Sequence, residues 1–228
     1  MSSNVASIPN ESRHDVVTFD ILTGDASLQK LDEAIEIMSI CIVKEVNRVP
    51  TARIVVRDGD AASGRFETAE QDSLTPGKKI QIKVGLDRSN KTLFKGIITK
   101  FSMKIREQGN ADLIIECKDE GMKLAVGRHS KYFEEKKDSE VIEEIISGYS
   151  GLSSDVEPTS LKHRELVQHH SSDWDFILAR AEMNGKLVII DDGKIQVKKP
   201  DTAQSPGLNL AFGSSLLEFE ARNCQKPG

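Results

Sequence analysis

The sequence predicts an α+β fold that is mainly β: a small antiparallel β-barrel or sandwich, then a small α/β unit, then a further β segment, which the family resemblance given below makes the first strand of a possible second barrel. Three observations lead to this prediction. Residues 16–118 contain six runs of alternating or β-branched residues separated by turn signals, as in a small barrel or sandwich. Helical spacing of apolar residues appears after residue 131, and β-type alternation returns at 208–220.

The strands expected in the first half are bounded by proline and glycine. Val49-Pro50 and Pro76-Gly77 favour turns, because proline restricts the residue before it and glycine accepts positive φ. Gln108-Gly109-Asn110 favours a hairpin turn. The expected strands cover residues 16–22, 36–46, 51–57, 79–84, 91–106 and 111–118. Two of them exceed the usual maximum of about 10 residues, which indicates strong coiling or extension beyond one sheet.

Alternation predicts which side chains share a face of these strands. In 79–84 the isoleucines and the valine share one face, while the lysines share the other. In 91–106 we expect one apolar face made of Ile97, Phe101, Met103 and Ile105. The basic face consists of Lys79, Lys83, Lys100, Lys104 and Arg106. It is either a solvated surface that opposes aggregation or an interface for an acidic partner.

Residues 58–74 are polar and contain glycine, so we expect a surface loop there. Asp58-Gly59-Asp60 begins like a calcium-binding loop. Ala62 and Ser63 break the EF-hand pattern, which needs further oxygen ligands and a glycine at fixed positions. An ordinary surface turn is therefore the expected structure.

The second half begins with a predicted helix near residues 138–149. Asp138 is expected to cap it, and Gly148 and Gly151 are expected to end it. Its apolar stripe consists of Val141, Ile142, Ile145, Ile146 and Tyr149. A short extended segment is expected at 156–159.

A second helix, preceded by a strand, is predicted between Ser172 and Gly185. Ser172 can cap its first turn, and Gly185 favours the left-handed conformation that ends a helix. Trp174, Ile177, Leu178 and Ala181 follow helical spacing on the expected buried face, while Arg180 and Glu182 are expected on the solvent side. Strands at 187–190 and 194–198 are expected to pair across an Asp192-Gly193 turn.

The amino-acid composition limits the classes of protein to which this chain can belong. The 228 residues are 38% hydrophobic and 29% charged, enough for one large or two small soluble domains. A net charge of -5 argues against a nucleic-acid binder. No apolar run approaches the roughly 20 residues of a membrane-spanning helix. The polar start of the chain lacks the apolar region of a secretory signal.

The three cysteines, Cys41, Cys117 and Cys224, form no CxxC pair. Cys41 and Cys117 lie in β-like runs, where a free thiol packs as a small apolar group. Neither a structural disulfide nor a zinc site is expected, which fits folding in a reducing cytoplasm.

The strongest enzymatic candidate is a cluster of His163, His169, His170, Asp173 and Asp175. Imidazoles and carboxylates this close in sequence could ligate a metal, so a metal-dependent hydrolase using His163, His169 and Asp173 is one alternative. Against it, adjacent strand residues point to opposite faces, and acids are favoured in a helix's first turn without any catalytic role. No GxSxG or GxGxxG motif is present. We expect no catalytic residue, no cofactor and no metal ligand.

Several segments resemble VgrG, the spike protein of type VI secretion systems and related contractile injection machines. The similarity extends over about residues 15–221 and keeps the family's order. The matching segments are ELVQ (165–168), DWDFILARAE (173–182), NGKLVIIDDG (184–193), EVNRVPTARIVVRDGD (45–60), FKGIITKFSMKIR (94–106), IIECKDEGMKLAVGR (114–128), SKYFEEKKDSEVIEEII (130–146) and SLLEFEA (215–221).

This resemblance implies a hub similar to that of contractile phage tails. In the family, three copies each carry two barrels related to tail-tube subunits, and together they match the hexameric inner tube. The family continues into an OB-like domain and a β-helical needle. Here Gly228 follows shortly after SLLEFEA, so most of the second barrel and the needle are expected to be absent. A fragment, a shortened paralogue and a split component stay open as explanations.

The domain organisation expected from this resemblance has four parts. A flexible N-terminus (1–14) precedes a tail-tube-like β-barrel (15–130). An α/β unit (131–205) and a β segment (206–228) leading toward an absent second barrel follow. The strands at 36–46 and 91–106 are expected to supply the assembly surface.

The expected function is that of a structural hub in the spike base, not an enzyme, which joins the inner tube to the spike by self-assembly. Expected partners are further copies of the chain (a trimer in the family), a hexameric Hcp-like inner-tube protein and baseplate proteins, with no nucleic acid and no direct membrane span. The protein is expected to be made and assembled in the bacterial cytoplasm without a signal peptide, and exported with the machine. A further alternative is an envelope- or carbohydrate-binding module, although one Trp and two Tyr offer few rings for stacking on sugars.

Overall fold

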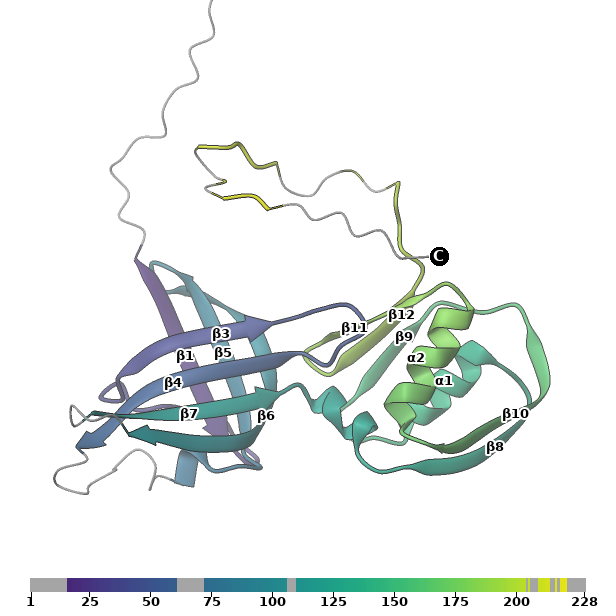
Figure 1. Cartoon of the computed structure of the whole chain (residues 1–228), viewed down its shortest axis with the longest axis horizontal. Helices are drawn as coiled ribbons and strands as arrows, with labels where there is room; N and C mark the ends of the chain where they lie inside the picture. Colours follow the sequence, from purple (N-terminus) through teal and green to yellow (C-terminus); the bar gives the residue numbers. More distant parts are fainter. Residues whose placement is uncertain are drawn as a thin grey trace, which may run out of the picture.

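The computed structural model of the chain describes residues 16–60, 72–105, 110–203, 205, 209–213, 216 and 218–220. Two units lie side by side, a curled β-sheet and a smaller α/β unit (Figure 1). The expectations for the N-terminus (1–14), for residues 61–71 of the polar loop, for Gln108-Gly109, and for Arg106 and Cys224 fall outside the described residues.

The first unit is a seven-stranded sheet in the order β2-β1-β5-β6-β7-β4-β3, and all its neighbouring strands are antiparallel. Its strands are β1 (Val17–Gly24), β2 (Gln29–Lys30), β3 (Ile37–Val43), β4 (Thr51–Asp60), β5 (Lys79–Leu86), β6 (Ser89–Ile105) and β7 (Asn110–Lys118). A short 3-10 helix, η1 (Asp72–Leu74), precedes β5. The prediction of a mainly β, antiparallel architecture is confirmed.

The core of this unit lies on the inner face of the curled sheet. Ile80 and Ile82 are buried on β5, as the alternation predicts, and Phe94 of β6 packs with them. Strands β3 and β4 lie across β1 and β5 in Figure 1, and apolar side chains of all four belong to one core. Burial of these side chains stabilises the curl, at about 25 cal/mol per Å² of apolar surface.

The predicted closed barrel is not observed in the described part of the chain. Closure requires the first and last strands of the sheet to pair along their length. Here the two ends of the sheet are β2 and β3, and these two strands are not hydrogen-bonded to each other. Because β2 has only two residues, it covers only a small part of the edge of β1. The sheet is curled but open.

The apolar face predicted for residues 91–106 is partly wrong, because β6 contains a bulge at Thr99. Ile98 lies opposite Cys117, but Lys100 lies opposite Glu116, which leaves Thr99 as an extra residue. The Thr99 hydroxyl donates a hydrogen bond to the Glu116 carbonyl, 3.0 Å away. One extra residue reverses the alternation, so Ile97 faces away from Phe101 and its apolar neighbours.

The predicted surface turn at Asp58-Gly59-Asp60 is also wrong. These residues continue β4 opposite Ala111 and Asn110. Gly59 has a φ of 62° at a register shift, and Asp58 is buried. Glycine permits the bulge that keeps the strand paired at this point.

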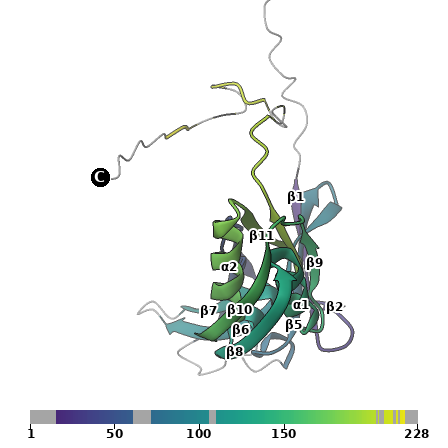
Figure 2. The same ribbon diagram turned by 90° about the vertical axis from the view of Figure 1, so that its right-hand side faces the viewer.

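The second unit packs two helices between two small sheets (Figures 1 and 2). Strand β8 pairs with β10, and β9 lies parallel to β12, which pairs with β11. Its elements are η2 (Glu120–Ala125), β8 (His129–Lys137), α1 (Asp138–Ser147), β9 (Ser153–Val156), β10 (Lys162–Ser171), α2 (Asp173–Met183), β11 (Leu187–Asp191) and β12 (Lys194–Lys198). Strand β8 was missed from the sequence, and β9 lies a few residues before its expected position.

Several local predictions for this unit are confirmed. The Ser172 hydroxyl accepts a hydrogen bond from the Asp175 N–H at 3.0 Å and so caps α2. Gly185 has a φ of 63° directly after the helix, and the Asp192-Gly193 turn has positive φ at both positions. The isoleucines of α1 and the apolar face of α2 share one core with β8, β11 and β12.

After Lys198 the described residues contain no strand. An isolated bridge links Phe212 and Leu216. The predicted first strand of a second barrel is therefore not seen among the residues that can be described there.

Candidate assembly surface

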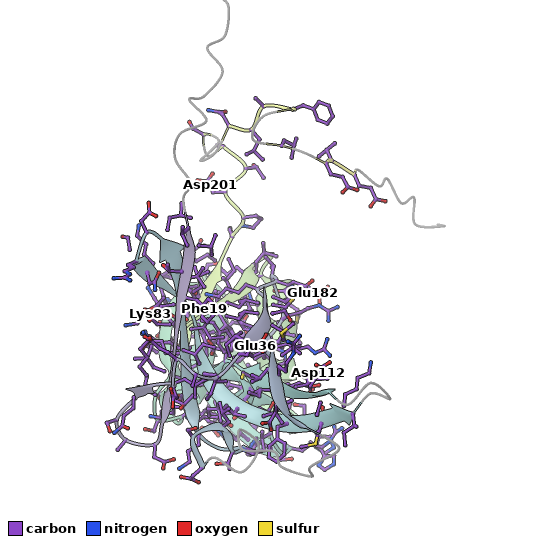
Figure 3. All side chains as sticks on the ribbon, turned by 90° about the vertical axis from the view of Figure 1, so that its left-hand side faces the viewer. Phe19, Glu36, Lys83, Asp112, Glu182 and Asp201 are labelled. Atoms are coloured by element: carbon purple, nitrogen blue, oxygen red, sulfur yellow. The ribbon has the colours of Figure 1, made fainter. Side chains whose placement is uncertain are left out.

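An apolar groove of about 400 Å³ lies between strands β1 and β3 at the open side of the sheet. We call this groove, with the strand edges that flank it, the open seam. Phe19 of β1 and Glu36, which precedes β3, are labelled on this side of the molecule in Figure 3. The groove is lined by Val17, Phe19, Ile37, Met38, Ser39, Ile40, Ile42, Val84 and Leu93.

The side chains of the open seam are continuous with the core. Val17 and Phe19 lie on the same face of β1 as Ile21, which is buried. Yet Val17 is 65% exposed and Phe19 is 44% exposed, because no described element covers the inner face at this end. Contiguous apolar surface of this kind marks an interaction site more often than an isolated exposed residue does.

Backbone groups are also available at the open seam. Strand β1 pairs with β5 along one edge, but β2 covers its other edge only at Leu22 and Thr23. Strand β3 pairs with β4 on one edge, and no described strand occupies the other. Among the described strands, residues 17–20 and 37–43 therefore have no partner on one edge, and such an edge can accept an added strand.

The other expected assembly strand contributes a second apolar area. Phe101, Met103 and Ile105 of β6 lie opposite buried residues of β7, yet all three are exposed. Strand β3 carries exposed Met38 and Val43, so both strands expected to supply the assembly surface have exposed apolar side chains.

The basic outer face is interleaved with acids in the structure. Lys100 lies 3.7 Å from Glu116, and Arg57 lies 3.0 Å from Glu36. The Asp20 carboxylate lies 3.0 Å from Lys30 and also accepts a hydrogen bond from Asn90. Exposed pairs of this kind add about 0–1 kcal/mol each, so they keep this face soluble rather than stabilise it.

The β11–β12 hairpin joins the two units. Asn47, in the loop between β3 and β4, makes two 2.8 Å hydrogen bonds with Val188, one through its backbone and one through its side chain. The Asp192 carboxylate accepts a hydrogen bond from the Lys95 N–H at 3.0 Å. Since these contacts involve two separate places on the sheet, they hold the hairpin in a defined orientation.

Buried Asp119 reinforces this junction. Its carboxylate accepts hydrogen bonds from the Gly121 N–H at 2.8 Å and from the Gly193 N–H at 3.1 Å. Burial raises the pKa of Asp119, and the two backbone hydrogen bonds partly oppose that shift. The carboxylate thereby ties the end of β7 to the turn between β11 and β12.

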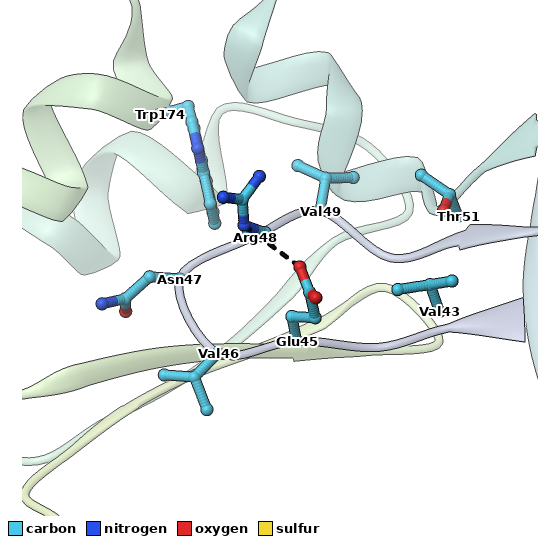
Figure 4. A pocket seen from close by; sticks show the side chains of 8 residues that line it. All are labelled: Val43, Glu45, Val46, Asn47, Arg48, Val49, Thr51 and Trp174. Atoms are coloured by element: carbon cyan, nitrogen blue, oxygen red, sulfur yellow. Dashed lines mark ion pairs between the residues drawn. The ribbon is translucent and has the colours of Figure 1, made fainter. Parts of the chain in front are cut away.

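A second groove, of about 560 Å³, lies beside the loop between β3 and β4 (Figure 4). Glu45 and Arg48 form an ion pair of 3.1 Å along it, and Trp174 of α2 lines it from the α/β unit. Trp174 is mostly buried in the core of the α/β unit, so its ring offers little surface for stacking on a sugar. This position weakens the carbohydrate-binding alternative.

The residues of the hydrolase alternative do not converge. His163 lies 3.0 Å from Asp138 and 3.1 Å from Arg180. Asp173 instead accepts hydrogen bonds from Tyr149 at 2.6 Å and from Gln168 at 2.7 Å. His169 and His170 are exposed at the end of β10, and Asp175 is exposed on α2. In the described ranges, no group of three or more His, Cys, Asp or Glu side chains could hold a metal ion.

Asp173 supports the fold by these contacts. Burial and the hydrogen bond to Asp173 raise the pKa of Tyr149 to about 12, so Tyr149 stays a donor at neutral pH.

In the sheet, burial raises the pKa of the Cys117 thiol to about 12, which leaves this thiol unreactive.

Two predicted side-chain positions are wrong. Asp138 does not cap α1, and Arg180 is not on the solvent side of α2. Both are buried and bond to each other, with 2.5 Å between Arg180 Nε and Asp138 Oδ1. The helical spacing could have indicated that Arg180 is buried, because Arg180 lies three residues after Ile177, which is fully buried, and shares its face of α2.

The fold is that of phage-tail and injection-machine tail proteins. The 43 kDa tail protein of prophage MuSo2 from Shewanella oneidensis superposes with a TM-score of 0.66 at 9% identity, over 86% of this chain and 57% of that one. The E. coli c3393 protein, described as a type VI secretion component structurally similar to T4 tail proteins gp27 and gp5, gives 0.62 at 12% identity, over 84% of this chain and 52% of that one. A chain of the Francisella PdpA-VgrG complex gives 0.51 at 15% identity, over 79% of this chain and 28% of that one.

The chain spans little more than half of the first two of these proteins. At such identities the similarity concerns the fold alone. The chain belongs to the family described as Alg8 N-terminal domain, whose model matches residues 13–223. No curated protein matches the sequence. The resemblance to VgrG seen in the sequence is thus supported at the level of fold.

No helix in the described part of the chain combines the length and apolar character needed to cross a membrane.

Proposed function

We propose that this chain is a structural hub component of a contractile injection machine, at the base of a type VI secretion spike, and that it is not an enzyme. The observation that carries the proposal is the fold similarity to tail proteins over 84–86% of the chain. The open seam supports it, because an apolar groove between unpaired strand edges fits assembly better than chemistry.

The proposed partners are further copies of the chain, a hexameric inner-tube protein and baseplate proteins. Assembly in the bacterial cytoplasm and export with the machine belong to the same proposal. The division of the chain into a β domain and an α/β unit, expected as a barrel at 15–130 and an α/β unit at 131–205, is also proposed. Two separate apolar core clusters support two units, and because Leu124 belongs to the core of the α/β unit, we propose a boundary nearer residue 119.

The test is a binding and mass measurement on the full chain. We expect light scattering after size-exclusion chromatography to give a mass that rises with concentration. We also expect immobilised inner-tube protein from the same genome to retain the chain, while an unrelated hexameric ring protein does not. A strict monomer without affinity for the inner tube would contradict the proposal, and stoichiometric zinc or manganese in the purified chain would favour the hydrolase instead.

A further inference from the structure

The outer face of the β8–β10 pair carries two acidic side chains next to each other. Glu134 of β8 and Glu165 of β10 lie directly opposite in the register, and both are exposed. Like charges in this position repel each other across an antiparallel pair. Lys162 pairs with Glu135 instead, at 3.0 Å, and within the described ranges no cation lies at ion-pair distance from Glu134 or Glu165. Two negative charges therefore stay without a counter-charge on this face.

The same face also carries apolar surface. Tyr132 lies opposite Val167, and these side chains are 52% and 55% exposed. Phe133 and Leu166, their neighbours along the strands, point the other way into the core of the α/β unit. An aromatic ring beside carboxylates suits a lysine or arginine side chain, whose charge pairs with the acids and whose stem covers the ring. We call this surface the ribbon face; it consists of Tyr132, Glu134, Glu165 and Val167.

A complementary group of lysines lies on the outer face of the sheet. Lys79 and Lys83 flank Gln81 on β5, and Lys95 of β6 lies directly opposite Gln81. The isoleucines between them on β5 are buried, so these lysines point away from the core. We call the three lysines the lysine face.

The lysine face also lacks counter-charges. Asp20 of β1 lies opposite Lys83, but its carboxylate pairs with Lys30 at 3.0 Å. Among the residues that the structure describes, no carboxylate lies at ion-pair distance from Lys79, Lys83 or Lys95. This part of the sheet thus differs from the places where lysines and acids of the outer face are paired.

Charge is divided unevenly between the two units. Residues 78–105 contain eight basic residues and one acidic residue, whereas residues 134–165 contain nine acidic and four basic residues. Figure 1 places β8 and β10 at the end of the molecule away from the sheet. Because the hydrogen bonds between Asn47 and Val188 hold the units in this orientation, one chain cannot bring its own two faces together. A second copy of the chain supplies the complementary charge for each.

We propose that the ribbon face of one copy docks on the lysine face of a second copy, with Glu134 and Glu165 against the three lysines and Tyr132 against a lysine stem. This proposal rests on the self-association proposed above and adds a contact separate from the open seam. Two sheet faces can pack about 10 Å apart. Since the contact joins two different faces, it repeats from copy to copy and forms a ring where the rotation closes.

The first experiment compares Glu134→Lys/Glu165→Lys with Glu143→Lys/Glu182→Lys, which makes the same charge change at exposed positions of α1 and α2. Sedimentation velocity over a concentration series measures self-association of each full chain. We expect the ribbon variant to associate at least about tenfold more weakly than the control, because it places like charges in contact. Raising NaCl from about 50 mM to about 500 mM should weaken association of the wild type, because salt screens exposed charges.

The second experiment tests which two faces meet. Lys79→Glu/Lys83→Glu should weaken self-association as the ribbon variant does. An equimolar mixture of these two double variants should associate again, because the reversed ribbon face of one chain meets the reversed lysine face of the other. Restored association also shows that both variants are folded. A mixture that associates no better than either variant alone would overturn the pairing of these faces.

The outcomes separate this contact from the proposed hub function. Equal association of the wild type and Glu134→Lys/Glu165→Lys would overturn the contact and leave the hub function standing. If that variant self-associates normally but no longer binds the inner-tube protein, the ribbon face belongs to the tube contact and the second copy is the wrong occupant. A wild-type chain that stays monomeric and does not bind the inner tube would overturn both proposals.

Discussion

At the residue scale, the pair of Asp138 and Arg180 is the most consequential feature of the α/β unit. Asp138 Oδ1 accepts from Arg180 Nε, while Oδ2 lies 2.9 Å from the Asn184 amide and 3.0 Å from His163. These side chains come from α1, α2 and β10, so one carboxylate links three elements. Burial alone would raise the pKa of Asp138, but the hydrogen bonds from Arg180, Asn184 and His163 outweigh it and lower the pKa to about 2.

Arg180→Ala should destabilise the protein by about 3–5 kcal/mol, because it leaves the Asp138 carboxylate buried without its main partner. Urea denaturation followed by circular dichroism measures the change. Glu182→Ala, at an exposed position of the same helix, should stay within about 0.5 kcal/mol of the wild type. Equal costs for the two variants would show that the buried pair has no special role.

The stability conferred by Asp138 should depend on pH. Its folded pKa lies below the ordinary value of 3.8, so its contribution is present above about pH 4 and is lost as the pH falls toward 2. The difference in unfolding free energy between the wild type and Asp138→Asn should therefore shrink between pH 5 and pH 2. A difference that is constant over this range would contradict the assignment.

At the element scale, bulges and glycines decide how β6 runs through the sheet. The bulge at Thr99 reverses which face of the sheet the following side chains of β6 occupy. Gly96 lets β6 and β7 approach each other closely. A Cβ atom at Gly96 would lie 2.2 Å from the Lys118 carbonyl oxygen and 2.9 Å from the Phe94 ring. The obstacle is mainly backbone, which cannot move aside as a flexible side chain would.

Gly96→Ala should therefore destabilise the protein by more than about 2 kcal/mol, as overpacking in a well-packed region does. Lys95→Ala is the matched control, because Lys95 is exposed on the same strand and only its N–H bonds to Asp192. Thermal unfolding compares them. A Gly96→Ala variant as stable as the control would mean that β6 and β7 separate there at no cost.

At the scale of the whole molecule, the sheet is curled around a core but left open between β1 and β3. Phe94 is fully buried in that core, whereas Phe19 lies on the same inner face and is 44% exposed. The exposed residues at the open seam thus contribute little to the stability of a single chain and are available for association.

Val17→Ser/Phe19→Ser should lower the unfolding free energy by about 1–2 kcal/mol, less than a substitution in the core, since both side chains are only partly buried. The same variant should reduce concentration-dependent association in light scattering. Phe94→Ala should cost about 3–5 kcal/mol through the cavity that it leaves. If the seam variant associates as the wild type does, the open seam is not the assembly surface.

The sequence by itself determined the features that depend on neighbouring residues. The Ser172 cap, the Gly185 stop, the Asp192-Gly193 turn and the alternation around Ile80 and Ile82 are confirmed, because each rests on short-range hydrogen bonds, φ preference or strand period. The strand assignments of the first half follow from the same signals.

Only the tertiary structure decided which distant parts meet. Nothing local distinguishes an Asp138 that caps a helix from one that binds Arg180, which lies 42 residues later. The bulge at Thr99 depends on the register with β7, and the open seam depends on whether the two end strands of the sheet pair. Such choices are set by packing among distant segments, whose energies do not appear in any short window of sequence.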